Sequence, residues 1–166
     1  MKKKYLITTI IALGVITLDQ SLKLYVDRVV PLYHSISIIK DFVDITYVRN
    51  SGAAFGFLAG QVNSLRLFFF TTLTVAAIVV IFILLKKLKD NQLLLISSLS
   101  LIMGGAVGNL IDRVRIGEVI DFIDIHWHSH HWPAFNVADS AITIGGIFWV
   151  IEILFKKRSS FIQAEK

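Results

Sequence analysis

LRLFFFTTLTVAAIVVIFILL, residues 65–85, is a continuous apolar run in which Arg66 is the single charged residue. A helix that crosses the roughly 30 Å hydrocarbon core of a bilayer needs about 20 predominantly apolar residues, because each residue adds only about 1.5 Å. Three more runs meet this requirement, at about residues 5–26, 93–111 and 136–155. The sequence therefore predicts an all-α polytopic membrane protein with four transmembrane helices.

The composition of the whole chain agrees with this class. Of its 166 residues, 55% are hydrophobic and 17% are charged, and the mean hydropathy is +0.69, unlike an average soluble domain. The basic residues behind the formal charge of +5 gather at the ends of the apolar runs, so nucleic acid is not an expected partner. The absence of cysteine excludes a disulfide and a thiolate nucleophile. We expect one membrane-embedded domain over residues 1–166.

Basic residues also predict how the chain crosses the membrane. Cytoplasmic segments carry an excess of Lys and Arg, and three basic clusters, at residues 2–4, 86–89 and 156–158, lie at helix ends that four crossings place on one side. Both termini are therefore expected in the cytoplasm, with the segments 27–64 and 113–135 outside. The first run follows three lysines, as a secretory signal does, but no small-residue cleavage site follows it, and we expect a retained helix.

The first outer segment carries a strand pattern. Polar and apolar residues alternate over 35–38 and 45–48, which predicts a small β-rich region outside the membrane. NSGAAFG, residues 50–56, follows this region, and its glycines permit tight turns and close approach of the backbone to a ligand. These residues alone leave a plain hairpin loop and a ligand-binding segment both open.

The third apolar run ends in MGGAVGNLIDR, residues 103–113. Its small residues predict close packing against a neighbouring helix. Asn109 and Asp112 lie three residues apart and hence on one helical face, and the guanidinium of Arg113 is suited to orienting a carboxylate. For Asp112 by itself, chemistry favours a structural role.

Two aspartates stand where apolar segments meet water, at positions where a charge is costly and commonly functional. In VIDFI, residues 119–123, strand alternation groups Asp121 with apolar neighbours, which are expected to raise the pKa of its carboxyl. Asn136 is predicted to cap the fourth helix, with Asp139 in the first turn. A negative charge there also stabilises a helix N-terminus by up to ~1 kcal/mol, so a functional and a purely structural role for Asp139 are both open.

Other residues offer competing chemistry. Four histidines lie close together between residues 126 and 131, beside Trp127 and Trp132. They could bind zinc together with Asp124. A solvated loop is favoured instead, with the two tryptophans in the aromatic belt at the membrane interface. The histidines are His126, His128, His130 and His131. A serine nucleophile at Ser51 or Ser140 needs a base and an oxyanion hole, and neither serine lies in a Gly-x-Ser-x-Gly motif.

Besides catalysis, the aspartates could serve a transporter or belong to a structural membrane protein. Buried aspartates occur in proton or cation pathways, but such pathways distribute ionisable groups across the bilayer, whereas the carboxylates here cluster near the outer side. A structural membrane subunit would leave the aspartate pair without a task.

Taken in order, five motifs resemble the lipoprotein signal peptidases, the type II signal peptidases of bacterial membranes. The motifs are DQ with Lys23 at residues 19–23, RNSGAAFG at 49–56, GGAVGNLIDR at 104–113, VIDF at 119–122 and FNVADS at 135–140. The resemblance covers nearly the whole chain. It implies a multi-pass protein of the bacterial inner membrane with its active site near the extracytoplasmic face. The implied activity is that of an aspartic endopeptidase that removes signal peptides before a diacylglyceryl-modified cysteine.

The resemblance also implies roles for individual residues. The catalytic pair falls on Asp121 and Asp139, while Asp19 and Lys23 are expected to be structural. The residues that bind substrate or support the pair are Asn50, Gly52, Asn109, Asp112, Arg113 and Asn136. No metal or cofactor is implied. The expected partners are diacylglyceryl-modified prolipoproteins and membrane lipids, and the protein is expected to act as a monomer.

The chemistry of paired carboxylates suits this activity. Two close carboxylates do not readily ionise together and tend to share one proton. The ionised member is expected to take a proton from water while the protonated member hydrogen-bonds the scissile carbonyl. Because the pair titrates as a unit, the sequence assigns neither role to Asp121 or to Asp139.

Overall fold

The computed structural model describes residues 2–52 and 64–164, and in this part of the chain four helices are long and apolar enough to cross a membrane. They are α1 (Lys3–Val29), α2 (Ser64–Lys87), α3 (Leu93–Ile116) and α4 (Val137–Ala164). The predicted transmembrane architecture is thereby confirmed. Of the predicted segment 50–56, residues 53–56 lie outside the described residues.

The helices extend beyond the predicted apolar runs. α3 continues past residue 111 through Asp112 and Arg113 to Ile116, so the helix is longer than the predicted apolar run 93–111. Gly117 ends this helix with φ of 79°, a left-handed conformation that glycine adopts without strain. Likewise α1 includes the first residues of the predicted segment 27–64, up to Val29.

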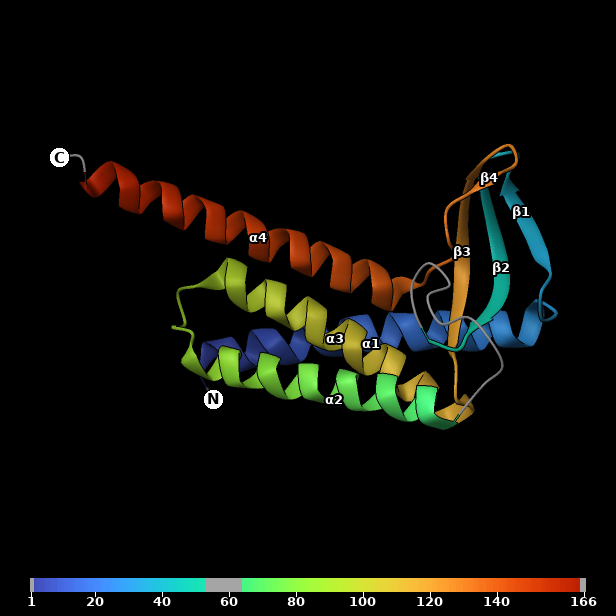
Figure 1. Cartoon of the computed structure of the whole chain (residues 1–166), viewed down its shortest axis with the longest axis horizontal. Coiled ribbons are helices and arrows are strands. Elements are labelled where there is room, and N and C mark those ends of the chain that lie inside the picture. Colours follow the sequence, from blue (N-terminus) through green and yellow to red (C-terminus); the bar gives the residue numbers. More distant parts are fainter. Residues whose placement is uncertain (1, 53–63, 165–166) are drawn as a thin grey trace.

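A four-stranded antiparallel sheet lies at one end of the helices (Figure 1). Its strands, in spatial order, are β1 (Ser35–Ile39), β2 (Val43–Asn50), β3 (Val119–Trp127) and β4 (His130–His131). The predicted small β-rich region is therefore confirmed. The short strand β4, built from residues predicted as a loop, pairs with the far end of β3 through His126 opposite His131.

α3 is the central helix of the bundle. In the most apolar stretch of α3, 50% of the residues are buried inside the protein, against 6% in that of α2. α3 also contacts all three other helices, α1, α2 and α4. Glycines bring the neighbouring helices close, since a Cβ on Gly104 would lie 3.1 Å from the backbone of Ala12, and one on Gly105 would lie 2.3 Å from the carbonyl oxygen of Ala138. The small residues of the third apolar run thus pack against helices on two sides, as predicted.

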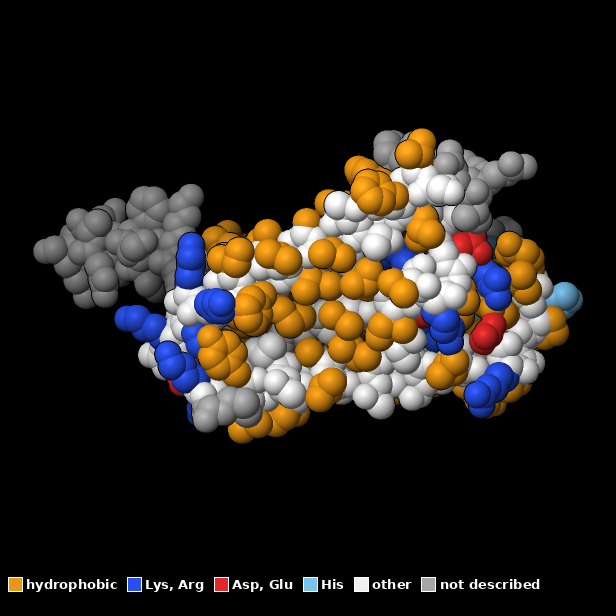
Figure 2. All heavy atoms as spheres, turned by 90° about the horizontal axis from the view of Figure 1, so that it is seen from below, with side chains coloured by type: hydrophobic (Ala, Val, Ile, Leu, Met, Phe, Trp, Pro, Cys, Tyr) orange, Lys and Arg blue, Asp and Glu red, His pale blue; other side chains and the backbone are white. Residues whose placement is uncertain are grey.

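The outer faces of the helices are apolar, as a lipid-facing surface requires. Hydrophobic side chains cover the helices along one face of the molecule, with Lys and Arg near both ends (Figure 2). On α2, Phe68 is 70% exposed and Phe69 55%. At the end opposite the sheet, the ammonium group of Lys4 donates hydrogen bonds to the carbonyls of Lys86 and Leu88 at 2.8 and 2.7 Å, so the first two predicted basic clusters do share one end of the bundle.

A small core fixes the sheet to the bundle. Val26 and Val30, at the end of α1, pack with Tyr47 of β2 and with Ile120 and Phe122 of β3, and all five are buried. Because side chains alternate along a strand, burial of Ile120 and Phe122 against α1 turns Asp121 to the other face of the sheet. The apolar pattern of β3 thereby positions this carboxylate.

Candidate active site

Asp121 and Asp139 meet around the side chain of Asn136. Asp121 lies in β3 and is 2% exposed, and Asp139 lies in the first turn of α4. The amide nitrogen Nδ2 of Asn136 donates to Oδ1 of Asp121 at 2.7 Å, while Oδ1 of Asn136 accepts from the backbone N–H of Asp139 at 2.9 Å. Two residues 18 positions apart are thus connected through one amide group.

Asn136 and Asp139 form a reciprocal cap on α4. The backbone N–H of Asn136 donates in return to Oδ2 of Asp139 at 3.3 Å, so each side chain satisfies a backbone donor of the other residue. This is the arrangement of a capping box with an aspartate in the third helical position. The predicted cap is confirmed, and it also aims the carboxylate of Asp139 toward Asn109.

Three asparagine side chains present N–H groups to the two carboxylates. Nδ2 of Asn50 donates to Oδ2 of Asp121 at 3.0 Å, and Nδ2 of Asn109 donates to Oδ1 of Asp139 at 2.8 Å. The carbonyl end of each amide is held by another donor. Oδ1 of Asn50 accepts from the Gly52 N–H, and Oδ1 of Asn136 accepts from the Asp139 N–H. Oδ1 of Asn109 accepts from the Lys23 ammonium. These contacts fix the direction of all three amides.

The surroundings favour a proton on Asp121. Burial raises the pKa of this carboxyl from 3.8 to about 7, and the neighbouring charge of Asp139 adds to the rise. The hydrogen bonds from Asn50 and Asn136 and the charge of Lys23 oppose it by stabilising the ionised form. The raised pKa that apolar neighbours of Asp121 predict is therefore present, with burial as its largest cause.

A buried ion cluster lies directly beneath the two aspartates. Nζ of Lys23 is 2.8 Å from Oδ2 of Asp19 and 2.8 Å from Oδ2 of Asp112, and all three side chains are fully buried. Gln20, to which sequence reasoning gave no role, donates to Oδ1 of Asp112 at 3.1 Å and to the Gly108 carbonyl at 3.1 Å. The adjacent polar residues Asp19 and Gln20, inside an apolar run, were the sequence feature that could have indicated a buried contact for Gln20.

Arg113 and Gly52 border the site without a hydrogen bond to either aspartate among the described contacts. Nη1 of Arg113 donates to the Asn109 carbonyl at 3.5 Å, and its guanidinium lies 5.9 Å from the centre of the Phe70 ring. A Cβ on Gly52 would come within 2.6 Å of the Phe70 side chain. The predicted support residues thus fall into two sets by their contacts. Asn50, Asn109 and Asn136 contact the two carboxylates directly, whereas Gly52, Asp112 and Arg113 contact residues next to them.

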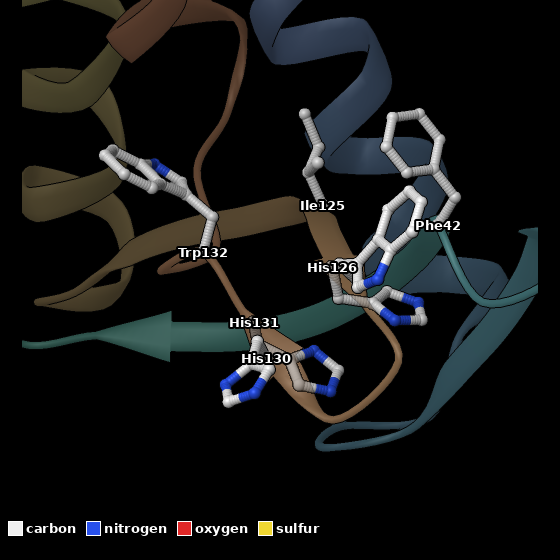
Figure 3. Close-up of a pocket in the computed structure, with 7 residues that line it drawn as sticks. Phe42, Ile125, His126, His130, His131 and Trp132 are labelled. Carbon is white, nitrogen blue, oxygen red and sulfur yellow. The ribbon is translucent and has the colours of Figure 1, made fainter.

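The histidine-rich hairpin lies at the far end of β3. Figure 3 shows the residues that line a depression of about 300 Å³ there, with His126, His130 and His131 beside Phe42, Ile125 and Trp132. The rings of His126 and His131 stack with centroids 4.6 Å apart. Nδ1 of His131 is 2.9 Å from Oδ2 of Asp124, and Nε2 of His126 is 3.4 Å from Oδ2 of Asp44. Within the described residues, no group of three or more His, Asp or Glu side chains is placed to hold a metal ion.

The two candidate serines contact groups that are poor bases. Oγ of Ser140 donates to the Asn136 carbonyl at 2.9 Å, and Oγ of Ser51 accepts from Arg66 at 3.3 Å. A backbone carbonyl and a guanidinium do not take a proton from a hydroxyl near neutral pH. The pair formed by the buried Asp121 and the partly buried Asp139 is therefore the arrangement best suited to chemistry in the described chain.

The helices, the sheet and the aspartates together describe a class of protein: a helix bundle that spans the membrane, with a small attached sheet and two adjacent aspartates, one buried and one partly buried. Residues 11–155 match the family model for signal peptidase (SPase) II. The chain is 49% identical to the lipoprotein signal peptidase of Geobacter sulfurreducens over 95% of its own length and 98% of that protein. It is 42% identical to that of Pseudomonas putida, over 90% and 87%.

Solved structures agree with this match. One, described as a bacterial membrane enzyme, superposes with a TM-score of 0.79 at 35% identity and covers 90% of this chain and 88% of its own. The chain belongs to the signal peptidase II family. The resemblance that its five motifs indicate is thereby confirmed.

Proposed function

We propose that this protein is a membrane aspartic endopeptidase that removes the signal peptide from diacylglyceryl-modified prolipoproteins by cutting before the lipidated cysteine. The observation that supports it best is the amide of Asn136, which touches the Asp121 carboxylate and the Asp139 backbone at once. The names of the related lipoprotein signal peptidases point to the same class of substrate.

The reaction follows from the surroundings of the two carboxyls. Asp121, with a pKa of about 7, holds the shared proton and donates a hydrogen bond to the scissile carbonyl oxygen. In this mechanism Asp139 is the ionised member of the pair and takes a proton from the water that attacks the carbonyl carbon. The C–N bond of the resulting tetrahedral intermediate then breaks as the departing nitrogen gains the proton that Asp139 took from water. The products are a signal peptide with a free carboxylate and a lipidated cysteine with a free amino group.

The remaining site residues hold the reacting groups in place. The three fixed asparagine amides keep both carboxyls in one orientation, and such preorganisation lowers the barrier of the chemical step. Phe68 and Phe69 offer an exposed apolar surface near the start of α2, where acyl chains of the substrate would rest. One chain supplies both aspartates, so a monomer suffices.

The proposed topology places both termini in the cytoplasm and the sheet outside. Lys4 and the carbonyls of Lys86 and Leu88 mark the cytoplasmic end, in accord with the excess of basic residues there. Asp121 and Asp139 then lie near the extracytoplasmic surface, at the side on which a translocated precursor arrives.

Asp121→Asn and Asp139→Asn test the catalytic assignment. Each is expected to lower the cleavage rate of a purified diacylglyceryl-modified precursor by at least about 10³-fold, because Asn can neither give nor take the shared proton. Asp124→Asn is the matched control, since Asp124 lies on the same strand and contacts His131 instead. Thermal unfolding in the same detergent checks folding. A folded Asp121 or Asp139 variant with wild-type cleavage refutes the aspartic mechanism.

The substrate assignment is tested separately. The same precursor without its diacylglyceryl group should be cut far more slowly by the wild-type protein. Equal rates for the two precursors would contradict a lipid-dependent peptidase and would favour a general intramembrane protease.

A further inference from the structure

All three N–H groups of the Lys23 ammonium point to side chains that lie beneath the two aspartates. Its Nζ lies 2.8 Å from Asp19, 2.8 Å from Asp112 and 2.9 Å from Oδ1 of Asn109, and the side chain is fully buried. An ammonium carries three N–H donors and no acceptor. The group is therefore saturated, and each of its three partners is fixed in position.

The contact with Asn109 determines which end of that amide faces Asp139. Oδ1 of Asn109 receives donors from both Lys23 and Nδ2 of Asn136, at 2.9 and 3.3 Å. Neither donor group can accept a hydrogen bond, so a rotated amide would set N–H groups against each other. Nδ2 of Asn109 is thus directed to Oδ1 of Asp139 at 2.8 Å.

The two carboxylate partners of Lys23 hold the backbone beside the aspartate pair. Oδ1 of Asp19 accepts from the N–H of Ala138 at 2.9 Å, and Oδ2 of Asp112 accepts from the N–H of Ile120 at 3.2 Å. Ala138 immediately precedes Asp139, and Ile120 immediately precedes Asp121. Contacts from one ammonium group therefore reach both halves of the pair.

We propose that Lys23 is a positioning residue for catalysis, which sets the direction of the Asn109 amide toward Asp139 and the relative placement of the two aspartates. The proposal rests on the aspartic mechanism above. It differs from a structural role alone, because it requires the chemistry of the pair, and not only the stability of the fold, to change when the ammonium is lost.

Charge balance guides the choice of variants. Lys23 with Asp19 and Asp112 carries a formal charge of −1, from one cation and two anions. Lys23→Met alone would leave two buried carboxylates without their cation and is at risk of unfolding. The double variant Lys23→Met with Asp112→Asn keeps the formal charge at −1. Asp112→Asn alone retains the contact from Lys23 to Asn109 and is the reference.

The measurement is steady-state cleavage of the diacylglyceryl-modified precursor as a function of pH. Relative to Asp112→Asn, the double variant is expected to lose at least about tenfold in kcat with KM within about twofold, because interactions that act only in the transition state change kcat. The acid limb of its profile should move to higher pH, since the ionised pair has lost both the nearby positive charge of Lys23 and an aligned donor. An unchanged kcat and pH profile in a folded double variant overturns the proposal.

Lys4→Met is the matched control for stability. Lys4 is also buried on α1 and also ties α1 to other parts of the bundle, but at the end remote from the aspartates. We expect it to lower the unfolding temperature and leave kcat and the pH profile at wild-type values. A similar kinetic change in Lys4→Met would mean that loosening of α1 alone explains the effect, and would overturn the proposal.

A measurement on the wild-type protein covers the case in which the double variant does not fold. The side-chain amide protons of Asn109, observed by NMR with asparagine labelled, should exchange with solvent only on unfolding. Fast exchange or averaging of these protons would overturn the proposal without any variant. Failure of the aspartic mechanism is recognised independently, by activity that survives Asp121→Asn or Asp139→Asn.

Discussion

Asn136 and Asp139 hold each other: the Asp139 N–H donates to the Asn136 side chain at 2.9 Å, and the Asn136 N–H donates to the Asp139 carboxylate at 3.3 Å. This cap starts α4 and at the same time leaves Nδ2 of Asn136 free to reach Asp121. The local signal that begins a helix and the geometry of the candidate active site are therefore one arrangement.

Replacing Asn136 separates these two roles. Asn136→Ser keeps a side-chain oxygen that can cap α4 but loses the N–H group on Asp121, whereas Asn136→Ala loses both. We expect both variants to lose most of the cleavage activity, and Asn136→Ala to be less stable than Asn136→Ser by ~1 kcal/mol. Chemical denaturation in detergent, followed by tryptophan fluorescence, measures the difference. Equal stabilities would show that the cap contributes little.

Asp121→Asn should change how stability depends on pH. Because the pKa of Asp121 is raised from 3.8 to about 7, the folded protein retains this proton where the unfolded chain has lost it. The contribution of Asp121 to stability is then greatest below pH about 4 and falls as the pH rises to about 7. Asparagine does not titrate, so the variant should lack this part of the fall. Unfolding temperatures measured from pH 4 to 8 test this, and parallel curves for the two proteins would contradict it.

Gly105 should be intolerant of any side chain. A Cβ there would lie 2.3 Å from the Ala138 carbonyl oxygen and 2.8 Å from Ile142, so Gly105→Ala must push α4 away from α3 and displace the adjoining Asp139. We expect a loss of ~1–3 kcal/mol in stability, typical of overpacking, together with a lower cleavage rate. Gly14→Ala is the control, since a Cβ at Gly14 meets nothing within 4 Å. Similar effects of the two substitutions would refute this account of α3–α4 packing.

The sequence predicts those elements of the fold that depend on residues close together in the chain or on a repeating pattern of apolar residues. Hydropathy predicts four helices, alternation predicts strands near residues 35–48, and the spacing of Asn136 and Asp139 predicts a cap. The third predicted apolar run ends at about residue 111, whereas α3 continues to Ile116, because hydropathy marks where apolar residues end and not where the helix ends. Within this helix Asp112 pairs with Lys23, which lies 89 positions earlier in the chain.

The contacts that build the candidate site are long-range and carry no local signal. The resemblance to a family indicated Asp121 and Asp139, but not that Asn136 connects them or that Gln20 contacts Asp112 from 92 residues away. Lys23 was predicted to be structural, and its link to Asn109 spans 86 residues. Such partners depend on how α1, α3 and α4 pack, which hydropathy does not specify.

The histidine hairpin should loosen as the pH rises. A hydrogen bond to the His128 carbonyl raises the pKa of His126 above 6.5, and the carboxylates of Asp44 and Asp124 add to the rise, while burial opposes it. The ring of His131 stacks on the other side and pairs with Asp124. With a raised pKa, the stabilisation from charged His126 is fully present below pH about 6.5 and is lost as the pH passes through the pKa of the folded protein.

Hydrogen exchange at the backbone N–H of Trp132, which bonds the Ile125 carbonyl at 2.8 Å, reports on this hairpin. After correction for the intrinsic effect of pH on exchange, its protection should fall between pH about 6 and 8 in the wild-type protein and stay level in His126→Gln. The amide of Ile96, which bonds the Gln92 carbonyl in α3 far from the hairpin, is the internal control and should not change with either pH or substitution. Constant protection at Trp132 in the wild-type protein would mean that His126 does not charge in this range, and that Asp44 and Asp124 hold the hairpin without it.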